Sequence, residues 1–179
     1  STVVDENKVY GDYLYTTSTS KGLTKHFEKS CNFLINKKYI KKNDFILDIG
    51  SNDGSNLEIY KNKNFKVLGV EPAKELCNIS RKKGVNCIEA FFSNKVVHQI
   101  LNKHGKPKLI CIYNVLANID NLREFTENLK KLCNQNTVIS IESFSLFGIL
   151  KNNLFDNIYH EHLSYFHVEN LKYFFKKFG

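Results

Sequence analysis

The sequence contains no methionine and no tryptophan, and it contains only two prolines. Because no initiator methionine is present, we expect the chain to be a trimmed fragment of a longer protein. It also has no apolar run near the roughly 20 residues that cross a bilayer, and the polar start STVVDENK does not resemble a signal peptide. These absences predict a cytoplasmic protein that has no membrane partner.

Arginine is nearly absent, since it occurs only at positions 81 and 123, although the formal net charge is +8. The positive charge therefore comes almost entirely from lysines, which are scattered along the chain among many asparagines. Sequence-specific nucleic-acid recognition relies on arginine forks that read base edges, so we expect no nucleic-acid partner. A positive field also suits a small anionic substrate such as a nucleotide diphosphate.

The five cysteines are odd in number and widely spread, which does not fit a disulfide framework or a zinc knuckle. Most of them stand among apolar residues, where a free thiol acts as a small hydrophobic side chain. They are Cys31, Cys77, Cys87, Cys111 and Cys133. We therefore expect unpaired thiols in the core.

Apolar runs alternate with amphipathic segments through the middle of the chain, without repeats or low-complexity linkers. This alternation predicts an α/β, Rossmann-like fold with a mostly parallel, doubly wound sheet. The expected strands are 45–49, 66–70, 86–89, 109–113 and 137–142, and the expected helices are 22–40, 55–62, 74–83, 93–103, 122–133 and 168–178. We expect one compact, monomeric unit, in which residues 1–40 form a substrate-side segment and helix and residues 41–179 bind the cofactor. Gly179 resembles a helix stop, after which further strands are expected in a longer chain.

The stretch FILDIGSNDG, at residues 45–54, combines a buried apolar strand with a glycine turn. Gly50 and Gly54 lack a Cβ, so the backbone can turn tightly and a ligand can lie against it. The N–H groups at the start of the following helix face the same crevice. The dinucleotide fingerprint G-x-G-x-x-G requires a second glycine where this chain has Asn52. The turn therefore argues against NAD and favours S-adenosylmethionine.

Glu71 ends the next predicted strand, 21 residues after Gly50, at the position of a ribose-binding acid. Its carboxylate can accept hydrogen bonds from both ribose hydroxyls, although a solvated glutamate at a strand end shows the same pattern. Phe91, after the third strand, fits either an adenine ring or the core, and Asn114, after the fourth, fits either a ligand contact or a turn. The predicted cofactor set is Asp48, Gly50, Ser51, Asn52, Gly54, Glu71, Pro72, Phe91, Phe92 and Asn114.

Four titratable side chains stand together at residues 159–162, after the fifth predicted strand. The imidazole of His160 or His162 can act as a base near neutral pH once a neighbour fixes its tautomer. Tyr159 and Glu161 are such neighbours. A metal site is the alternative, but H-E-H lacks the i, i+4 spacing of the zinc protease motif and has no evident third ligand. We therefore predict acid–base chemistry and no metal in this segment.

Together these motifs resemble the S-adenosylmethionine-dependent sugar C-methyltransferases, which act on nucleotide-linked keto-deoxysugars. The resemblance covers most of the chain. It is carried by Y-x-Y-x-T-S-x-S at 13–20 with His26, IGSNDG at 49–54, GVEPA at 69–73, EAFFS at 89–93, NVLAN at 114–118 and YHEHLSYF at 159–166. A generic methyltransferase would share only IGSNDG and GVEPA, so the last motif is the most specific to the family.

The resemblance implies that His162 is the base, that Tyr159 and Glu161 lie close to it, and that Tyr15 lies near the sugar. The base would remove a proton next to a carbonyl, and the resulting enolate carbon would take the methyl group, leaving S-adenosylhomocysteine. The implied substrate contacts are Tyr13, Ser18, Ser20, His26, Asn118 and His160. The resemblance also implies a cysteine-bound zinc domain before residue 1 and a nucleotide-fold domain after residue 179, so zinc is expected only outside this chain.

Two positions depart from the family pattern. Thr17 replaces a serine, which exchanges one hydroxyl for another, whereas Asn118 replaces a histidine and removes an imidazole from the crevice. His162 is then left as the sole expected base. Two alternatives stay open on the sequence: an O- or N-methyltransferase of another small molecule or RNA, and a non-catalytic fragment that only binds the cofactor.

Overall fold

The computed structural model describes Tyr10, residues 15–159 and residues 161–178. At its centre lies a five-stranded parallel sheet in the order β3-β2-β1-β4-β5. The strands are β1 (Phe45–Ile49), β2 (Lys66–Glu71), β3 (Cys87–Glu89), β4 (Leu109–Tyr113) and β5 (Val138–Glu142). Because parallel neighbours need a crossover connection, a helix lies between each strand and the next along the chain.

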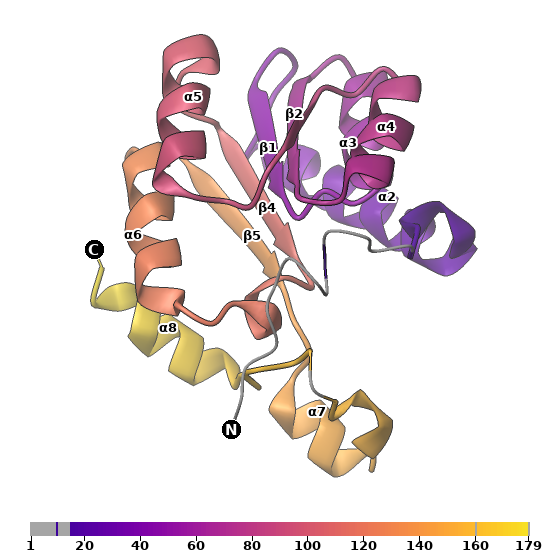
Figure 1. Cartoon of the computed structure of the whole chain (residues 1–179), viewed down its shortest axis with the longest axis vertical. Coiled ribbons are helices and arrows are strands. Elements are labelled where there is room, and N and C mark those ends of the chain that lie inside the picture. The colour runs from indigo at the N-terminus through magenta and orange to yellow at the C-terminus, as the bar shows by residue number, and fades with distance from the viewer. Residues whose placement is uncertain (1–9, 11–14, 160, 179) are drawn as a thin grey trace.

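Helices cover both faces of this sheet (Figure 1). The helices are α2 (Lys21–Asn36), α3 (Ser55–Asn62), α4 (Lys74–Lys82), α5 (Asn94–His104), α6 (Leu122–Leu132), α7 (Leu146–Lys151) and α8 (Val168–Lys176). Three short 3-10 turns are η1 (Thr17–Thr19), η2 (Leu116–Asn118) and η3 (Phe155–Asn157). Helices α2, α3 and α4 lie on one side of the sheet, and α5, α6 and α8 lie on the other (Figure 1). The predicted α/β, Rossmann-like fold is confirmed.

The central strands are buried on both sides, because successive side chains of a strand point to opposite faces. In β1, Ile46 packs in one cluster with Leu57 and Tyr60 of α3. Its neighbour Leu47 packs in the other cluster, which contains residues of α5 and α6 such as Ile100 and Leu129. These two layers hold the sheet rigidly, so the loops at the carboxyl ends of its strands have a fixed base.

Most predicted elements agree with the structure to within two residues, and β1, β4 and α3 agree at both ends. Helix α2 is the exception, since it was predicted to run to residue 40 and ends at Asn36. Lys38 has a φ of 59°, in the left-handed region that terminates helices, and Ile40 is then buried against the core. The helix stop predicted at Gly179 lies outside the described residues.

The prediction of five unpaired cysteines is wrong for two of them, because the structure joins Cys77 of α4 to Cys87 of β3. Their Cα atoms are 5.6 Å apart, which lies in the ordinary range for a disulfide. The sequence did not indicate this pair, since only the packing of α4 on β3 brings the two residues together. Cys31, Cys111 and Cys133 are free thiols.

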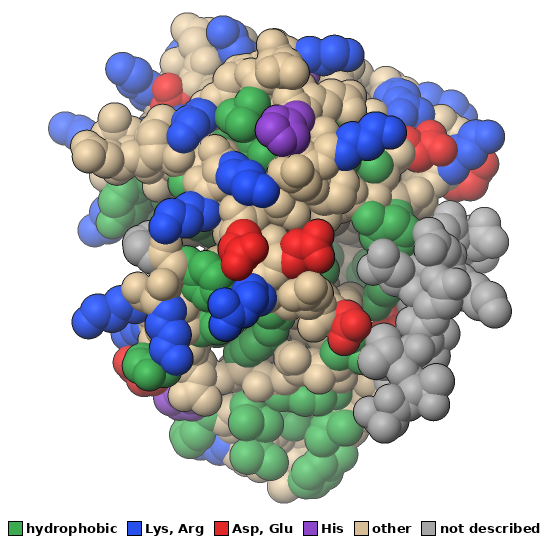
Figure 2. Space-filling model, turned by 60° about the vertical axis from the view of Figure 1, so that its left-hand side comes forward, with side chains coloured by type: hydrophobic (Ala, Val, Ile, Leu, Met, Phe, Trp, Pro, Cys, Tyr) green, Lys and Arg blue, Asp and Glu red, His purple; other side chains and the backbone are tan. Residues whose placement is uncertain are grey.

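The segment after β5 leaves the sheet and contains α7 and η3, which the sequence did not predict. Figure 2 shows hydrophobic side chains gathered at the lower end of the molecule, the level at which α7 lies in Figure 1. The exposed hydrophobic side chains of this segment are Phe144, Phe147, Leu150, Leu154, Phe155 and Ile158. None of the described helices is long and apolar enough to cross a membrane.

Candidate functional site

A cavity of about 550 Å³ lies where the strands end and their loops begin. Ligands of open parallel sheets bind at this edge, beyond the carboxyl ends of the strands. Four loops contribute to its wall, those that follow β1, β2, β3 and β4, and α2 and α6 close its sides. The volume falls within the range of small-molecule sites.

The lining includes most of the residues that the sequence singled out. Those in the lining are Tyr15, Asp48, Gly50, Ser51, Asn52, Glu71, Pro72, Phe91, Phe92, Asn114 and Asn118. Those outside it are Gly54, Ser18, Ser20, His26, Tyr159, Glu161 and His162. Tyr13 and His160 lie outside the described residues.

The two glycines of the turn have separate functions. Gly50 has a φ of +73°, and a Cβ there would collide with the side chain of Val115, which lines the cavity. Gly54 has a φ of +76° and is the N-cap of α3, and a Cβ there would lie 2.5 Å from Oγ of Ser80. Gly50 therefore allows a close approach at the cavity wall, whereas Gly54 fits α3 against α4.

Glu71 presents a buried carboxylate to the cavity. Its Oε2 accepts a hydrogen bond from the backbone N–H of Asn52 at 2.9 Å, and its Oε1 accepts one from the N–H of Ala73 at 3.0 Å. Burial raises the pKa of Glu71, and the two N–H donors oppose this rise. Each oxygen keeps a second lone pair, so the carboxylate can still accept two hydroxyl hydrogen bonds from a ligand.

Asp48, at the cavity floor, is held differently from Glu71. Nδ2 of Asn56 donates to its Oδ2 at 2.9 Å. Burial raises the pKa of Asp48 to about 7, and the nearby Glu71 carboxylate adds to this rise while the Asn56 hydrogen bond opposes it. Oδ1 of Asn56 is also buried and has no hydrogen-bond partner among the described residues. The lining around Asp48 therefore combines polar side chains with apolar ones.

The cluster around His162 lies beside this cavity. The backbone N–H groups of Leu163 and Ser164 both donate to the carbonyl oxygen of Ala117, at 2.7 Å and 3.1 Å. Ala117 belongs to η2 and precedes Asn118, which lines the cavity. These two hydrogen bonds join the segment after η3 to η2, next to His162 in the sequence.

The imidazole of His162 is buried among aromatic rings. Its centroid lies 4.2 Å from that of Tyr159, 4.9 Å from that of Phe144 and 5.9 Å from that of Tyr165. Nδ1 lies 2.9 Å from the carbonyl oxygen of Asn157. Because a carbonyl oxygen only accepts, Nδ1 carries the proton and Nε2 keeps a lone pair. The geometry therefore leaves Nε2 as a basic nitrogen.

His26 forms a separate pair near the opposite wall. Its Nε2 lies 2.5 Å from Oε2 of Glu142, at the end of β5. Nδ2 of Asn114, a lining residue, donates to the other oxygen of Glu142 at 3.4 Å. This contact joins α2 to the loop after β4. Among the described residues, no three histidine, cysteine, aspartate or glutamate side chains gather in a way that could hold a metal ion.

Sequence reasoning missed several lining residues that come from helices α2, α3 and α6. These are Leu23, Phe27, Asn56, Glu124, Phe125 and Asn128. For Asn56 a signal existed, because it stands in the first turn of the helix that follows the glycine turn. For the lining residues of α6 the sequence contained no such signal, because they belong to no motif and reach the cavity through the packing of the helix on the sheet.

Comparison with known proteins identifies a matching protein family and a distant relative. Residues 25–179 match the model of a family described as a methyltransferase domain. The C-methyltransferase NovU from Streptomyces niveus is 29% identical over 177 residues, which are 99% of this chain. The chain spans 42% of the length of that relative.

Solved structures show the same fold at lower identity. A SAM-dependent methyltransferase from Archaeoglobus fulgidus superposes with a TM-score of 0.68 at 20% identity, over 87% of this chain and 68% of its own. A SAM-dependent methyltransferase from Geobacter sulfurreducens, solved in complex with S-adenosyl-L-homocysteine, gives 0.51 at 13% identity, over 65% and 47% of the two chains. Since the family model matches most of the sequence, this chain belongs to the methyltransferase domain family.

Proposed function

We propose that this chain binds S-adenosylmethionine in the cavity and transfers its methyl group to carbon, releasing S-adenosylhomocysteine. The observation that carries the proposal is the buried Glu71 carboxylate opposite the turn at Gly50, at the edge of a parallel sheet. A methyltransferase of the same fold was solved with S-adenosyl-L-homocysteine, which supports the choice of ligand.

The residues of the cavity fit a nucleoside with an amino acid tail. The free lone pairs of Glu71 suit the two ribose hydroxyls. Phe91 in the wall suits an adenine ring, and Asn114 suits the amino acid end.

For the acceptor we propose a nucleotide-linked keto-deoxysugar, methylated at a carbon next to its carbonyl. The similarity to the C-methyltransferase NovU supports carbon as the methylated atom. Tyr15 and Asn118 also line the cavity, and we assign both side chains to the acceptor.

His162 is the proposed base. Its Nε2 has a lone pair because Nδ1 donates to Asn157. We assign it to the acceptor because the two residues that follow it bond to Ala117, the neighbour of the lining residue Asn118. Nε2 would take the proton from the carbon, and the electrons of that C–H bond would form an enolate. When bound, S-adenosylmethionine supplies an electrophilic methyl group, which the enolate carbon attacks. The proton on His162 would then pass to solvent.

The enolate oxygen needs donors, because the C–H group is a far weaker acid than imidazolium. Tyr15 and Tyr159 are the proposed donors. Partial burial and the nearby Glu161 carboxylate raise the pKa of Tyr159, so its hydroxyl keeps the proton that it donates. One such donor typically contributes about 3 kcal/mol to transition-state stabilisation.

The test combines product analysis with variants. The chain, alone and within a longer polypeptide, is incubated with S-adenosylmethionine carrying a labelled methyl group and with keto-deoxysugar nucleotides. We expect the label on a carbon by NMR, and we expect His162→Gln to abolish its transfer while S-adenosylhomocysteine still binds. His98→Gln, at an exposed histidine of α5, is the matched control. A label on oxygen or nitrogen, or full activity of His162→Gln, would refute the proposal.

A further inference from the structure

Residues 15–18, which we name the strap, precede α2, and two of them, Tyr15 and Thr17, line the cavity. The side chain of Asn52 holds the strap by three hydrogen bonds. Its Oδ1 accepts from the backbone N–H of Thr17 at 3.0 Å and from the Thr17 hydroxyl at 3.2 Å, and its Nδ2 donates to the carbonyl oxygen of Tyr15 at 2.9 Å. All of these contacts join residues at least 35 positions apart in the sequence.

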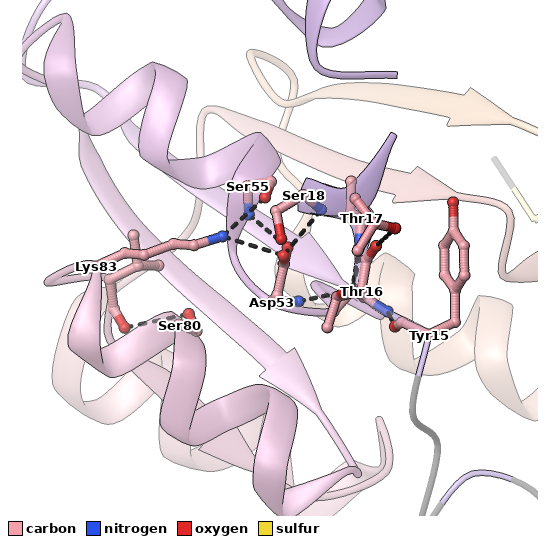
Figure 3. Close-up of polar contacts among 11 residues, drawn as sticks. Tyr15, Thr16, Thr17, Ser18, Asp53, Ser55, Ser80 and Lys83 are labelled. Atoms are coloured by element: carbon pink, nitrogen blue, oxygen red, sulfur yellow. Dashed lines mark hydrogen bonds and ion pairs between the residues drawn. The ribbon is translucent and has the colours of Figure 1, made fainter. Parts of the chain in front are cut away.

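Asp53 holds the other end of the strap (Figure 3). Its Oδ2 accepts from the N–H of Ser18 at 3.0 Å and lies 3.1 Å from Nζ of Lys83, while its Oδ1 accepts from the N–H of Ser55 at 3.1 Å. The carboxylate is fully buried. Although burial acts to raise the pKa of Asp53, the hydrogen bonds from Ser18, Ser55 and Lys83 outweigh it and hold the pKa below its ordinary value. The Ser18 hydrogen bond is therefore assisted by charge.

Asn52 also connects the strap to the proposed cofactor contact. Its backbone N–H donates to Oε2 of Glu71, while its side chain holds Thr17 and Tyr15. One residue therefore bonds to both walls of the cavity. A ligand that touches Glu71 on one wall and the strap on the other must favour the arrangement in which both walls are in place.

We propose that Asn52 and Asp53 are positioning residues that hold the strap over the cavity, and that filling the cofactor end of the cavity tightens the strap. Tyr15, which already lines the cavity, is then held more firmly once the cofactor has bound. The coupling rests on the proposed function for the identity of the ligand. It deepens that function because it favours binding of the cofactor before the acceptor, and because it assigns two residues that act through the strap and not on the reacting atoms.

The experiment measures hydrogen exchange of the Thr17 and Ser18 amides by NMR, with and without S-adenosylhomocysteine, while calorimetry records binding. In the unchanged chain we expect the ligand to slow both amides. Asp53→Asn removes the charge that assists the Ser18 hydrogen bond, and we expect the Ser18 amide to exchange about tenfold faster. Ser80→Ala is the matched control, because it removes a buried hydrogen bond to Val85 and none of the hydrogen bonds that hold the strap.

A second variant keeps the proposal testable should Asp53→Asn fail to fold. Thr17→Val removes only the hydroxyl contact to Asn52 and leaves the buried carboxylate paired. We expect faster exchange of the Thr17 amide and a weaker response to the ligand. Unchanged exchange in the folded variants would overturn the positioning role. Binding that leaves the exchange of both amides unchanged would overturn the coupling. A purely structural role of Asn52 and Asp53 would not require the ligand to slow these amides. If the amides exchange faster in the variants but S-adenosylhomocysteine does not bind, the proposed cofactor is refuted and the positioning role of Asn52 and Asp53 is still supported.

Discussion

Replacing Asp48 by asparagine should stabilise the protein relative to the unchanged chain, and this advantage in unfolding free energy should grow as the pH rises. The substitution removes a buried carboxyl but keeps its shape, and the new amide oxygen can still accept the hydrogen bond from Asn56. A carboxyl whose pKa is raised on folding holds its proton more tightly in the folded protein. It therefore favours the folded state at low pH, and this contribution disappears as the pH rises from 3.8 toward about 7. The asparagine variant has no such loss.

The size of the effect follows from the two pKa values. Each pH unit between 3.8 and about 7 is worth about 1.4 kcal/mol for one group, so the full difference comes to about 4 kcal/mol. We therefore expect the unfolding free energy of Asp48→Asn to exceed that of the unchanged chain by an amount that grows with pH. It should level off above about pH 7 at no more than about 4 kcal/mol.

Urea denaturation followed by circular dichroism, repeated at several pH values from about 5 to about 8, gives the difference between the two proteins. Asp156→Asn, at an exposed aspartate, is the control and should show no such growth. If the difference in unfolding free energy between Asp48→Asn and the unchanged chain stays flat or shrinks as the pH rises, folding does not raise the pKa of Asp48. The expected result would mean that the cavity floor retains a costly carboxyl, as functional sites often do.

Two further predictions concern single side chains. Gly54→Ala should lower the unfolding free energy by about 1–3 kcal/mol, because φ is positive and the added Cβ would meet Ser80, whereas Gly22→Ala, in a helix with open space around it, should be neutral or slightly stabilising. A thermal melt compares them, and equal melting temperatures would contradict the assigned role of Gly54. His26→Ala should change stability by less than about 1 kcal/mol because its pair with Glu142 is half exposed, and it should leave S-adenosylhomocysteine affinity unchanged in calorimetry. A large loss of either would show that the pair is a structural or cofactor contact.

The part of the cavity lining around Gly50 and Glu71 was predictable because its signals are local. The apolar run of β1, the turn at Gly50 and the acid at Glu71 are close in sequence, and a parallel sheet brings the ends of neighbouring strands to one edge. The lining therefore contains Gly50, Glu71, Phe91 and Asn114 together, as the order of strands and loops indicated.

The position of the segment after β5 was not predictable, because long-range contacts decide it. Acid–base chemistry was predicted at residues 159–162, but the sequence did not indicate that Ser145 caps α7 and that the chain leaves the sheet before this segment. Hydrogen bonds of Leu163 and Ser164 to Ala117 then hold the segment beside η2, and no sequence pattern encodes them. The hydrogen bonds of the Asn52 side chain to the strap could not be predicted either, because an asparagine in a turn does not indicate a partner 35 residues away in the sequence.

Cofactor binding in the cavity can be measured by calorimetric titration of the chain with S-adenosylhomocysteine, with NAD as the control ligand. We expect S-adenosylhomocysteine to bind and NAD not to bind, and we expect Glu71→Gln to weaken binding about tenfold through the lost hydroxyl contacts. Binding of NAD in preference to S-adenosylhomocysteine, or binding that Glu71→Gln leaves unchanged, would mean that the cavity is not the S-adenosylmethionine site proposed above.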